Sequence, residues 1–399
     1  MRPILAEPEL GRASVASRRL RLLHVTPTYY PAVRYGGPIV TVHGLCKALA
    51  ARGHEVHVFT TNVDGHGVSD TALDAPTELD GVEVHYFATG LGRRLFRSPA
   101  MAHALSREIS GFDAAHLHSV FLWPTTKSAR IARDRGTPYV LSPRGMLVRE
   151  LIESKSRMAK RAWIAAFEKG NVAGAASVHV TADLEAEHLR ALRLGARRID
   201  VVPNGVEAPA FFDEATSERR PRRVLYLGRL SWKKRLDCLI RAMIYAPRAE
   251  LVIAGFDDEG LRPRLEGLAQ ALGLAARVRC LGPAVGVEKW RLLADCDVFA
   301  LPSTQENFGV AALEALACGR PVVAAPGVGL VDAIVAAGAG LCVESEPCTL
   351  GTALEGLLDD ESACARMGAA ARELARTKYS WTTVAERMEQ VYLRAIAGQ

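Results

Sequence analysis

The chain has 399 residues, a net charge of +6 and 49% apolar residues. This length exceeds what one hydrophobic core usually supports, so two domains are expected, and the mild charge does not suit a dedicated nucleic-acid binder. No apolar run reaches the ~18 residues that span a bilayer, and the eight cysteines form no C-x-x-C pair, which favours buried thiols over disulfides or a bound metal.

Residues 1–19 mix charged and polar side chains with Pro3 and Pro8 and contain no apolar signal core. We expect a disordered leader there, and a cytoplasmic protein that touches a membrane only at its surface, peripherally at the inner face.

The first half alternates strands and helices. Arg21–Val25 predicts a strand, 26–38 a loop, and Ile39 opens a helix that stops at Arg52-Gly53. Strand, glycine loop, helix and strand form the βαβ unit of a doubly wound parallel sheet. Further strands are expected at Glu55–Thr60, Val82–Phe87, Ala114–Leu117, Tyr139–Ser142, Ser177–Thr181 and Asp200–Val202. A helix is expected at Pro124–Arg135, and a long helix or a helix pair at Leu147–Lys169.

A second alternating series follows the polar stretch Phe211–Arg223. Its strands are expected at Val224–Leu227, Leu251–Ala254, Val278–Leu281, Val298–Leu301 and Val322–Ala325. Its helices are expected at Leu236–Ala246, Leu261–Leu272, Lys289–Ala294, Gly309–Cys318, Thr349–Leu358, Ser362–Lys378 and Thr383–Ala397.

The sequence therefore predicts an α/β protein with two Rossmann-like, doubly wound domains facing a central cleft. We place the first domain at residues 20–205, a linker at 206–222 and the second domain at 223–379, and we expect the helix at 380–399 to pack back on the first domain. Ligands of such sheets lie at the carboxyl ends of the strands, here on both walls of the cleft.

The strongest chemical signal is a loop, Ser303–Gly309, between a buried strand and a helix. Glu306 in this loop is placed to accept hydrogen bonds from sugar hydroxyls, and Glu314 on the helix is placed to hold a ribose diol. The amides of Phe308, Gly309 and Val310 at the helix start offer a phosphate site. Taken alone, the two glutamates are better explained as unrelated surface residues.

A basic loop, Gly228–Lys234, follows the first strand after the linker. Arg229 and Lys234 are candidates to neutralise a diphosphate leaving group. A solvated basic loop is the alternative, but this loop ends a strand of the same sheet as the Glu306 loop, which favours the binding site.

These motifs resemble family 4 of the retaining glycosyltransferases. The resemblance covers residues 20–399 and rests on several motifs in the family's order. They are Gly36-Gly37-Pro38, Gly53-His54-Glu55-Val56, Val202-Pro203-Asn204-Gly205-Val206, Gly228-Arg229 with Lys234, the pair Glu306 and Glu314, and Leu313–Val323.

The resemblance implies the GT-B fold and a nucleotide-sugar donor, which is a co-substrate, with no other cofactor and no metal at the site. Arg229 and Lys234 would bind the diphosphate, Glu306 the sugar hydroxyls with the amides of Asn307 to Val310 beside it, and Glu314 the ribose. Gly36 and Gly37 would let the opposite loop approach the phosphate.

A histidine of the first domain completes the implied site. His118 would lie at a strand end facing the sugar, whereas His116 is expected to point the other way and to serve packing. With Arg229, Lys234 and Glu306, His118 forms the expected catalytic set.

Two positions depart from the family pattern. Arg235 replaces the glycine that commonly follows the phosphate-binding lysine, and 328–332 lacks the usual Gly-Gly-x-Pro-Glu stretch. Asp332 stands where the glutamate is common, so the shape of that loop is in question.

Two features of the first domain, where an acceptor would bind, each have two interpretations. Arg144, after the strand Tyr139–Ser142, is either a contact to an acceptor phosphate or the donor, or a structural arginine. The helical stretch Leu147–Lys169 either rests on an anionic membrane surface through Lys155, Arg157, Lys160 and Arg161, or is a solvated helix with Trp163, Ile164 and Phe167 in the core.

The expected activity is transfer of a hexosyl group, with retention, from a nucleoside-diphosphate sugar to an acceptor hydroxyl. A saccharide or lipid-linked saccharide acceptor in bacterial surface-polysaccharide or glycolipid assembly fits by family analogy. A sugar-nucleotide 2-epimerase and a non-catalytic nucleotide-sugar-binding subunit are the alternatives. A dehydrogenase is disfavoured because no G-x-G-x-x-G follows the first strand of either domain.

Overall fold

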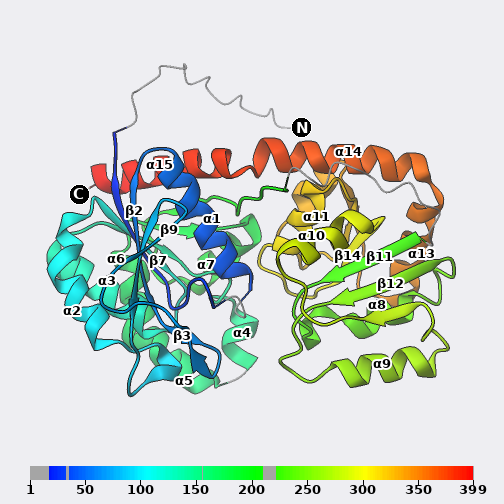
Figure 1. The fold of residues 1–399 in the computed structure, drawn as a ribbon, viewed down its shortest axis with the longest axis horizontal. Coiled ribbons are helices and arrows are strands. Elements are labelled where there is room, and N and C mark those ends of the chain that lie inside the picture. The colour runs from blue at the N-terminus through cyan, green and yellow to red at the C-terminus, as the bar shows by residue number, and fades with distance from the viewer. Residues whose placement is uncertain (1–17, 33–35, 155, 210–221, 399) are drawn as a thin grey trace.

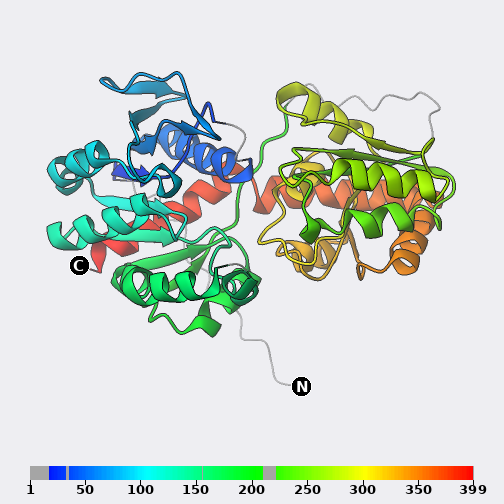
Figure 2. The same ribbon diagram turned by 90° about the horizontal axis from the view of Figure 1, so that it is seen from below.

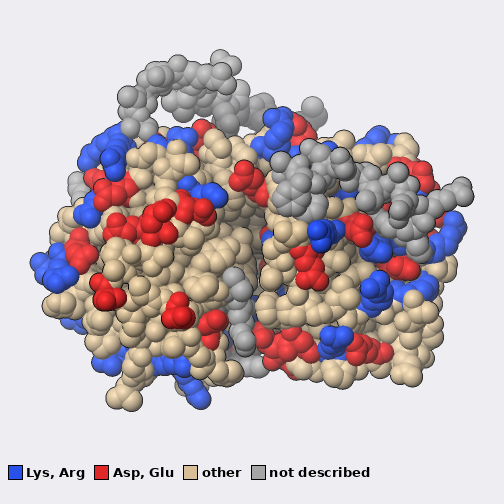
Figure 3. Space-filling model, viewed as in Figure 1, with Lys and Arg blue, Asp and Glu red and all other residues tan. Residues whose placement is uncertain are grey.

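The computed structural model describes residues 18–32, 36–154, 156–209 and 222–398, which form two lobes side by side (Figure 1). The expected leader, residues 1–19, and linker, residues 206–222, therefore lie mostly outside the described residues. Lys and Arg side chains are interspersed with Asp and Glu over the face seen in Figure 3, in keeping with the mild net charge. Among the described residues, no helix is both long and apolar enough to cross a bilayer.

The N-terminal lobe is built on one sheet with the strand order β10-β9-β8-β7-β1-β2-β6-β5. The strands pair in parallel except at the edge, where β5 runs antiparallel to β6. Their bounds are β1 (Arg21–Val25), β2 (Glu55–Thr61), β5 (Thr77–Leu79), β6 (Val82–Phe87), β7 (Ala114–His118), β8 (Tyr139–Ser142), β9 (Ser177–Val180) and β10 (Ile199–Val201), and a small hairpin joins β3 (Val63–Asp64) to β4 (Gly67–Val68).

Helices cover both faces of this sheet. They are α1 (Gly37–Ala51), α2 (Pro99–Glu108), α3 (Trp123–Arg135), α4 (Arg149–Ser154), α5 (Arg157–Trp163), α6 (Lys169–Gly174) and α7 (Asp183–Leu192). One apolar core lies under α2 and α3, and a second lies under α1 and the C-terminal helix α15 (Trp381–Ala397). The central strands β1, β2, β7 and β8 thus bury side chains in both cores, as expected of a doubly wound parallel sheet.

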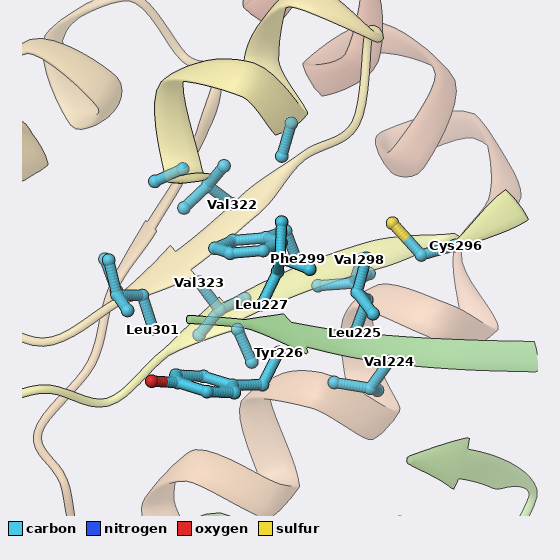
Figure 4. Close-up of a cluster of buried hydrophobic side chains, with 14 of the residues drawn as sticks. Val224, Leu225, Tyr226, Leu227, Cys296, Val298, Phe299, Leu301, Val322 and Val323 are labelled. Atoms are coloured by element: carbon cyan, nitrogen blue, oxygen red, sulfur yellow. The ribbon is translucent and has the colours of Figure 1, made fainter. Parts of the chain in front are cut away.

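The C-terminal lobe has an all-parallel sheet with the order β13-β12-β11-β14-β15-β16. The strands are β11 (Arg222–Leu227), β12 (Ala249–Ala254), β13 (Val278–Cys280), β14 (Val298–Leu301), β15 (Val322–Ala324) and β16 (Gly340–Cys342). The helices are α8 (Leu236–Ala242), α9 (Arg262–Ala271), α10 (Gly286–Asp295), α11 (Val310–Ala317), α12 (Val331–Ala336), α13 (Pro347–Asp359) and α14 (Glu361–Lys378). Side chains of β11, β14 and β15 form the centre of its core (Figure 4).

The last two helices connect the lobes. α14 lies on the C-terminal lobe and α15 crosses to the N-terminal lobe, so that they run along one side of the whole molecule (Figures 1 and 2). Trp381, the first residue of α15, fills the space left by two glycines, because a Cβ on Gly44 or on Gly205 would overlap its ring. Where the chain crosses between the lobes, Val206 N donates to Tyr379 O at 2.8 Å, so the two crossing segments are tied together.

Most expected strands and helices are present within one or two residues of their predicted bounds. The stretch Leu147–Lys169 is broken instead into α4, α5 and a π-helical turn, Ile164–Glu168, which continues into α6. Among the α-helices and strands of the described residues, seven had no sequence prediction, namely α2, α7, α12, β3, β4, β5 and β16.

Candidate active site

The carboxyl ends of the two sheets meet around the start of α11. A Cβ on Gly37, at the start of α1, would lie 3.6 Å from Val310 Cγ2 across the cleft. Tyr30 lies close enough to Glu314 of α11 for that carboxylate to help raise the pKa of the phenol, after the larger effect of burial. The loop predicted to approach a donor phosphate therefore faces the predicted phosphate-binding helix start.

The basic loop after β11 lies against the Glu306 loop. Lys234 Nζ forms an ion pair with Glu306 Oε2, and Thr304 N donates to Lys233 O at 3.0 Å. Arg229 is exposed, and its carbonyl accepts from the Tyr226 hydroxyl at 2.9 Å. Two predicted site residues are thus in direct contact, and the third projects from the same loop.

Lys233 is a cation of this loop to which the sequence analysis gave no role. Burial lowers its pKa first, and the neighbouring charges of Lys234 and Arg229 lower it further. Three cations are therefore close enough to repel one another, and a bound anion would relieve that repulsion.

The Glu306 loop is held from behind by the segment 325–330. Glu306 N donates to Gly327 O at 2.9 Å, and Gly329 N donates to Glu306 O at 2.9 Å. A Cβ on Gly327 would overlap Thr304 O, and a Cβ on Gly329 would overlap Asn307 O. Although the family's usual sequence is missing here, these two glycines still allow the close backbone approach.

α11 presents Glu314 and its own first amides. Glu314 is 6% exposed, and its Oε1 accepts from Lys289 Nζ of α10 at 2.6 Å. Gly309, with φ of 98°, occupies the N-cap and leaves α11 without a side-chain cap. Phe308 is a core residue in contact with Tyr379, so only its backbone can take part in binding. The sequence analysis missed Lys289, which lies 25 positions from its partner.

Asn307 joins the two lobes. Its Nδ2 donates to Thr181 Oγ1 at 2.9 Å and to Glu185 Oε2 at 3.0 Å. Glu185, 4% exposed on α7, also accepts from Thr181 N at 2.8 Å and from Gly145 N at 2.6 Å. A Cβ on Gly145 would come 2.6 Å from Asn307 Cβ. We call Asn307, Thr181, Glu185 and Gly145 the interlobe clasp, because it ties the donor loop to the loop of Arg144.

Replacing Glu185 by glutamine is expected to lower kcat at least about tenfold and to lower Tm. The new amide would face backbone and side-chain donors, and leaving a buried donor unpaired costs about 1–3 kcal/mol. The donor loop would then lose its anchor, so kcat should fall more than KM for the donor rises. Steady-state kinetics with thermal unfolding checks this.

Glu187→Gln is the matched control, since Glu187 is exposed on the same helix. Wild-type kcat in Glu185→Gln, or equal losses in both variants, would show that the clasp does not position the loop.

His116 does not point away from His118, so that prediction is wrong. Residues two apart on a strand share a face, and the two rings lie with centroids 4.1 Å apart. His24 of β1 and His179 of β9 join them in a buried layer beneath α15.

The hydrogen bonds of His116 and His179 determine their tautomers. His179 Nε2 lies 2.8 Å from Val202 O, which can only accept, so His179 carries its proton on Nε2. His179 Nδ1 then accepts from His116 Nε2 at 3.3 Å, and His116 Nδ1 accepts from the Tyr392 hydroxyl at 2.8 Å. Both rings are neutral, and Tyr392 of α15 is the last donor in this series of hydrogen bonds.

A second series of hydrogen bonds begins at Arg144, whose guanidinium points toward the buried histidines. Arg144 Nη1 donates to Asn204 Oδ1 at 3.0 Å, and Nη2 donates to His118 Nδ1 at 3.1 Å. His118 Nε2 therefore donates to His24 Nδ1, at 3.1 Å. Burial lowers the pKa of Arg144 to about 10, so it stays charged, and burial with that charge lowers the pKa of His24 to about 3.

His118 and Arg144 are therefore engaged with each other, and His118 is closed to solvent in this structure. His118 is 1% exposed, and both of its ring nitrogens have partners. Either residue would have to exchange a partner before it touched a substrate.

Arg235 explains one departure from the family pattern. Its φ is 51° and ψ is 41°, the left-handed conformation that glycine adopts at little cost. The backbone thus keeps the turn between the basic loop and α8 despite the substitution.

Two family models match the chain, one for each lobe. Residues 36–205 match the glycosyl transferase 4-like domain, and residues 208–374 match the glycosyl transferases group 1. The D-inositol 3-phosphate glycosyltransferase of Stackebrandtia nassauensis is 30% identical over 407 residues, which cover 94% of this chain and 90% of that protein.

Solved structures share the fold. Sucrose-phosphate synthase from Thermosynechococcus elongatus has a TM-score of 0.76 at 22% identity, over 96% of this chain and 100% of that one. Anabaena HepE in complex with UDP-glucose has a TM-score of 0.69 at 19% identity, over 96% and 100% of the two chains. The expected GT-B fold of two Rossmann-like α/β domains is confirmed, and the chain belongs to the group 1 glycosyltransferases of the family 4 type.

Proposed function

We propose that this glycosyltransferase moves a hexosyl group from a nucleoside-diphosphate sugar to an acceptor hydroxyl with retention of the anomeric configuration. The observation that carries the proposal is the convergence of Arg229, Lys233 and the Lys234–Glu306 pair beside the start of α11. A solved relative in fold that holds UDP-glucose supports a nucleotide-sugar donor.

Donor binding would exchange the partners of two ion pairs. Lys234 would leave Glu306 for the diphosphate, with Arg229 beside it, and Glu306 would then accept from sugar hydroxyls. Glu314 would turn from Lys289 to the ribose diol. Because Lys234, Glu306 and Glu314 are already in ion pairs, these three side chains are held near their working positions before the donor arrives.

The chemical step we propose is a same-face displacement through an oxocarbenium-like transition state. Negative charge grows on the departing diphosphate, where Arg229, Lys234 and the amides of Asn307 to Val310 stabilise it. The departing phosphate oxygen takes the proton of the acceptor hydroxyl. The side-chain cations supply the neutralisation, so the donor site needs no metal ion.

Gly36, Gly37 and His118 would complete the site from the N-terminal lobe. The glycines leave room for the phosphate opposite Val310, and His118 would approach the sugar once Arg144 exchanges its partner. We keep Arg144 as a contact to an acceptor phosphate in that exchanged state.

A thermal-shift panel of nucleotides and nucleotide sugars tests the donor proposal. We expect a specific upward shift of Tm with UDP- or GDP-linked sugars. Incubation with the stabilising sugar nucleotide should then release a nucleoside diphosphate in the presence of a saccharide acceptor. Conversion to an epimeric sugar nucleotide would support the epimerase instead, and binding without turnover would support the non-catalytic subunit.

The acceptor is proposed to be a saccharide or a lipid-linked saccharide at the inner membrane face. Met158 is 77% exposed and Phe167 is 42% exposed. The alternative of a solvated helix placed Phe167 in the core, and the structure does not place it there. Arg157, Arg161 and Lys169 are exposed on the same stretch, and Lys155 lies outside the described residues. Apolar and basic side chains together suit an anionic leaflet.

Charge removal tests the membrane contact. The triple change Arg157→Gln, Lys160→Gln and Arg161→Gln is expected to weaken binding to anionic vesicles about 100-fold, because each cation near such a surface contributes about 1 kcal/mol. The same changes on α9, Arg262→Gln and Arg264→Gln, should have no effect. If the wild-type protein does not bind anionic vesicles at low salt, the proposed membrane contact is wrong.

A further inference from the structure

Two histidines and two glutamates form a file on adjacent strands of the N-terminal lobe. Glu55 and His57 lie two apart on β2, and Glu83 and His85 lie two apart on β6, so each pair shares a face. The register places His57 directly opposite Glu83. None of these four residues belongs to the donor site.

The ligand atoms of three of them are close together. Glu83 Oε1 lies 2.8 Å from His85 Nε2 and 3.3 Å from His57 Nδ1. A metal ion bound about 2.0–2.1 Å from imidazole nitrogen and carboxylate oxygen keeps those ligand atoms roughly 3.0–3.4 Å apart. The 3.3 Å distance falls in this range, the 2.8 Å distance is slightly shorter, and all three ligand atoms lie within 4.8 Å of one another. Small side-chain shifts would therefore bring the three groups around one ion.

The other nitrogen of His57 has the partner that metal-binding histidines commonly have. His57 Nε2 lies 2.8 Å from Glu55 Oε1, which also accepts from Arg21 Nε at 2.6 Å. A carboxylate on the far nitrogen fixes the ring and its tautomer, and leaves the lone pair of Nδ1 for a metal. A simple ion pair between His57 and Glu83 would not need Glu55 on the other nitrogen of His57.

We propose that His57 Nδ1, His85 Nε2 and the Glu83 carboxylate bind a divalent transition-metal ion, with Glu55 positioning His57. Two imidazoles and one carboxylate suit Zn²⁺ in a tetrahedral site whose fourth position holds water. Binding replaces the hydrogen bond between His85 Nε2 and Glu83, and the proton of His85 then lies on Nδ1. His57 keeps its proton on Nε2, toward Glu55.

An ion can reach this site from solvent, because the Glu83 and His85 side chains are 45% and 23% exposed. The other group of this kind among the described residues, His24, His116 and His118, is wholly buried and has the Arg144 cation 3.1 Å from His118 Nδ1. The proposed ion would tie β2 to β6 near the sheet edge. Its effect is on the stability of the N-terminal lobe and does not depend on the proposed donor chemistry.

Calorimetric titration of the metal-stripped full chain with Zn²⁺ tests the proposal. We expect one ion per chain and an upward shift of Tm. His85→Ala and the isosteric Glu83→Gln should abolish that binding, and Glu55→Gln should weaken it about 10- to 100-fold. His103→Ala, which removes an exposed histidine of α2, should bind as the wild type does.

Co²⁺ identifies the ligands by spectroscopy, since the chain also has exposed thiols at Cys342 and Cys348. The proposed site gives visible bands of a tetrahedral ion without sulfur charge-transfer absorption. No binding to the wild type, equal Zn²⁺ affinity in Glu83→Gln, or a thiolate spectrum would each overturn the proposal.

Discussion

Replacing Lys234 by alanine is expected to lower kcat about 10²- to 10³-fold, the usual cost of removing one group that stabilises developing negative charge. Lys234 is the cation held nearest the predicted sugar site, through its ion pair with Glu306. Without it, the growing charge on the diphosphate would lose its closest neutralising group. Nucleoside diphosphate release under steady-state conditions measures the effect.

The loss of the ion pair itself must be separated from the loss of phosphate binding. The double variant Lys234→Ala with Glu306→Gln removes the unpaired carboxylate, so it should regain Tm but not turnover. Arg241→Ala, on the exposed side of α8, is the control for a lost surface cation. Turnover of Lys234→Ala near the wild-type rate would remove Lys234 from the donor site.

Acidification from pH 6.5 to 5 is expected to destabilise the protein steeply. Burial lowers the pKa of His24 and His179 to about 3, and lowers the pKa of His116 and His118 well below 6.5. In that window the unfolded chain binds these protons and the folded chain does not, so stability falls as pH falls. Each such histidine contributes about 1.4 kcal/mol per pH unit once its unfolded form is charged.

The pH dependence of the free energy of unfolding, from urea titrations between pH 5 and 7.5, checks this prediction. His179→Gln should be less stable at pH 7.5. Its free energy of unfolding should also depend less steeply on pH, because one fewer proton is bound on unfolding. His103→Gln should keep the wild-type slope, because His103 is exposed. A flat profile in the wild type would mean that the four rings are not held neutral.

The alternation of apolar strands and helices predicted the sheets because each strand of a doubly wound fold is buried on both faces. β1, β6, β8 and β14 have the bounds that their apolar runs predicted. α7 has no side-chain N-cap, so nothing local marked its start. α2 begins at Pro99 after the N-cap Ser98, which are start signals that the sequence analysis overlooked. The π-helical turn Ile164–Glu168 was not predicted, and Trp163 Nε1 donates to Glu168 Oε1 at 3.0 Å within that stretch.

The site was predictable where short motifs sit at strand ends, as for Lys234 and Glu306. It was not predictable where partners come from distant segments. Asn307 finds Glu185 across 122 positions, and nothing local marks either residue as a partner of the other. The orientation of His116 was mispredicted for a simpler reason. Side chains alternate between the two faces of a strand, so residues two apart, such as His116 and His118, lie on the same face.

Hydrogen exchange with and without a nucleoside diphosphate tests the central claim most directly, because it maps where the donor binds. We expect protection of peptides covering 228–235 and 304–314, and of 36–42 across the cleft, with no protection of His57 and His85 on β2 and β6. Protection confined to other parts of the chain, with these three segments unchanged at saturating ligand, would contradict the proposed donor site.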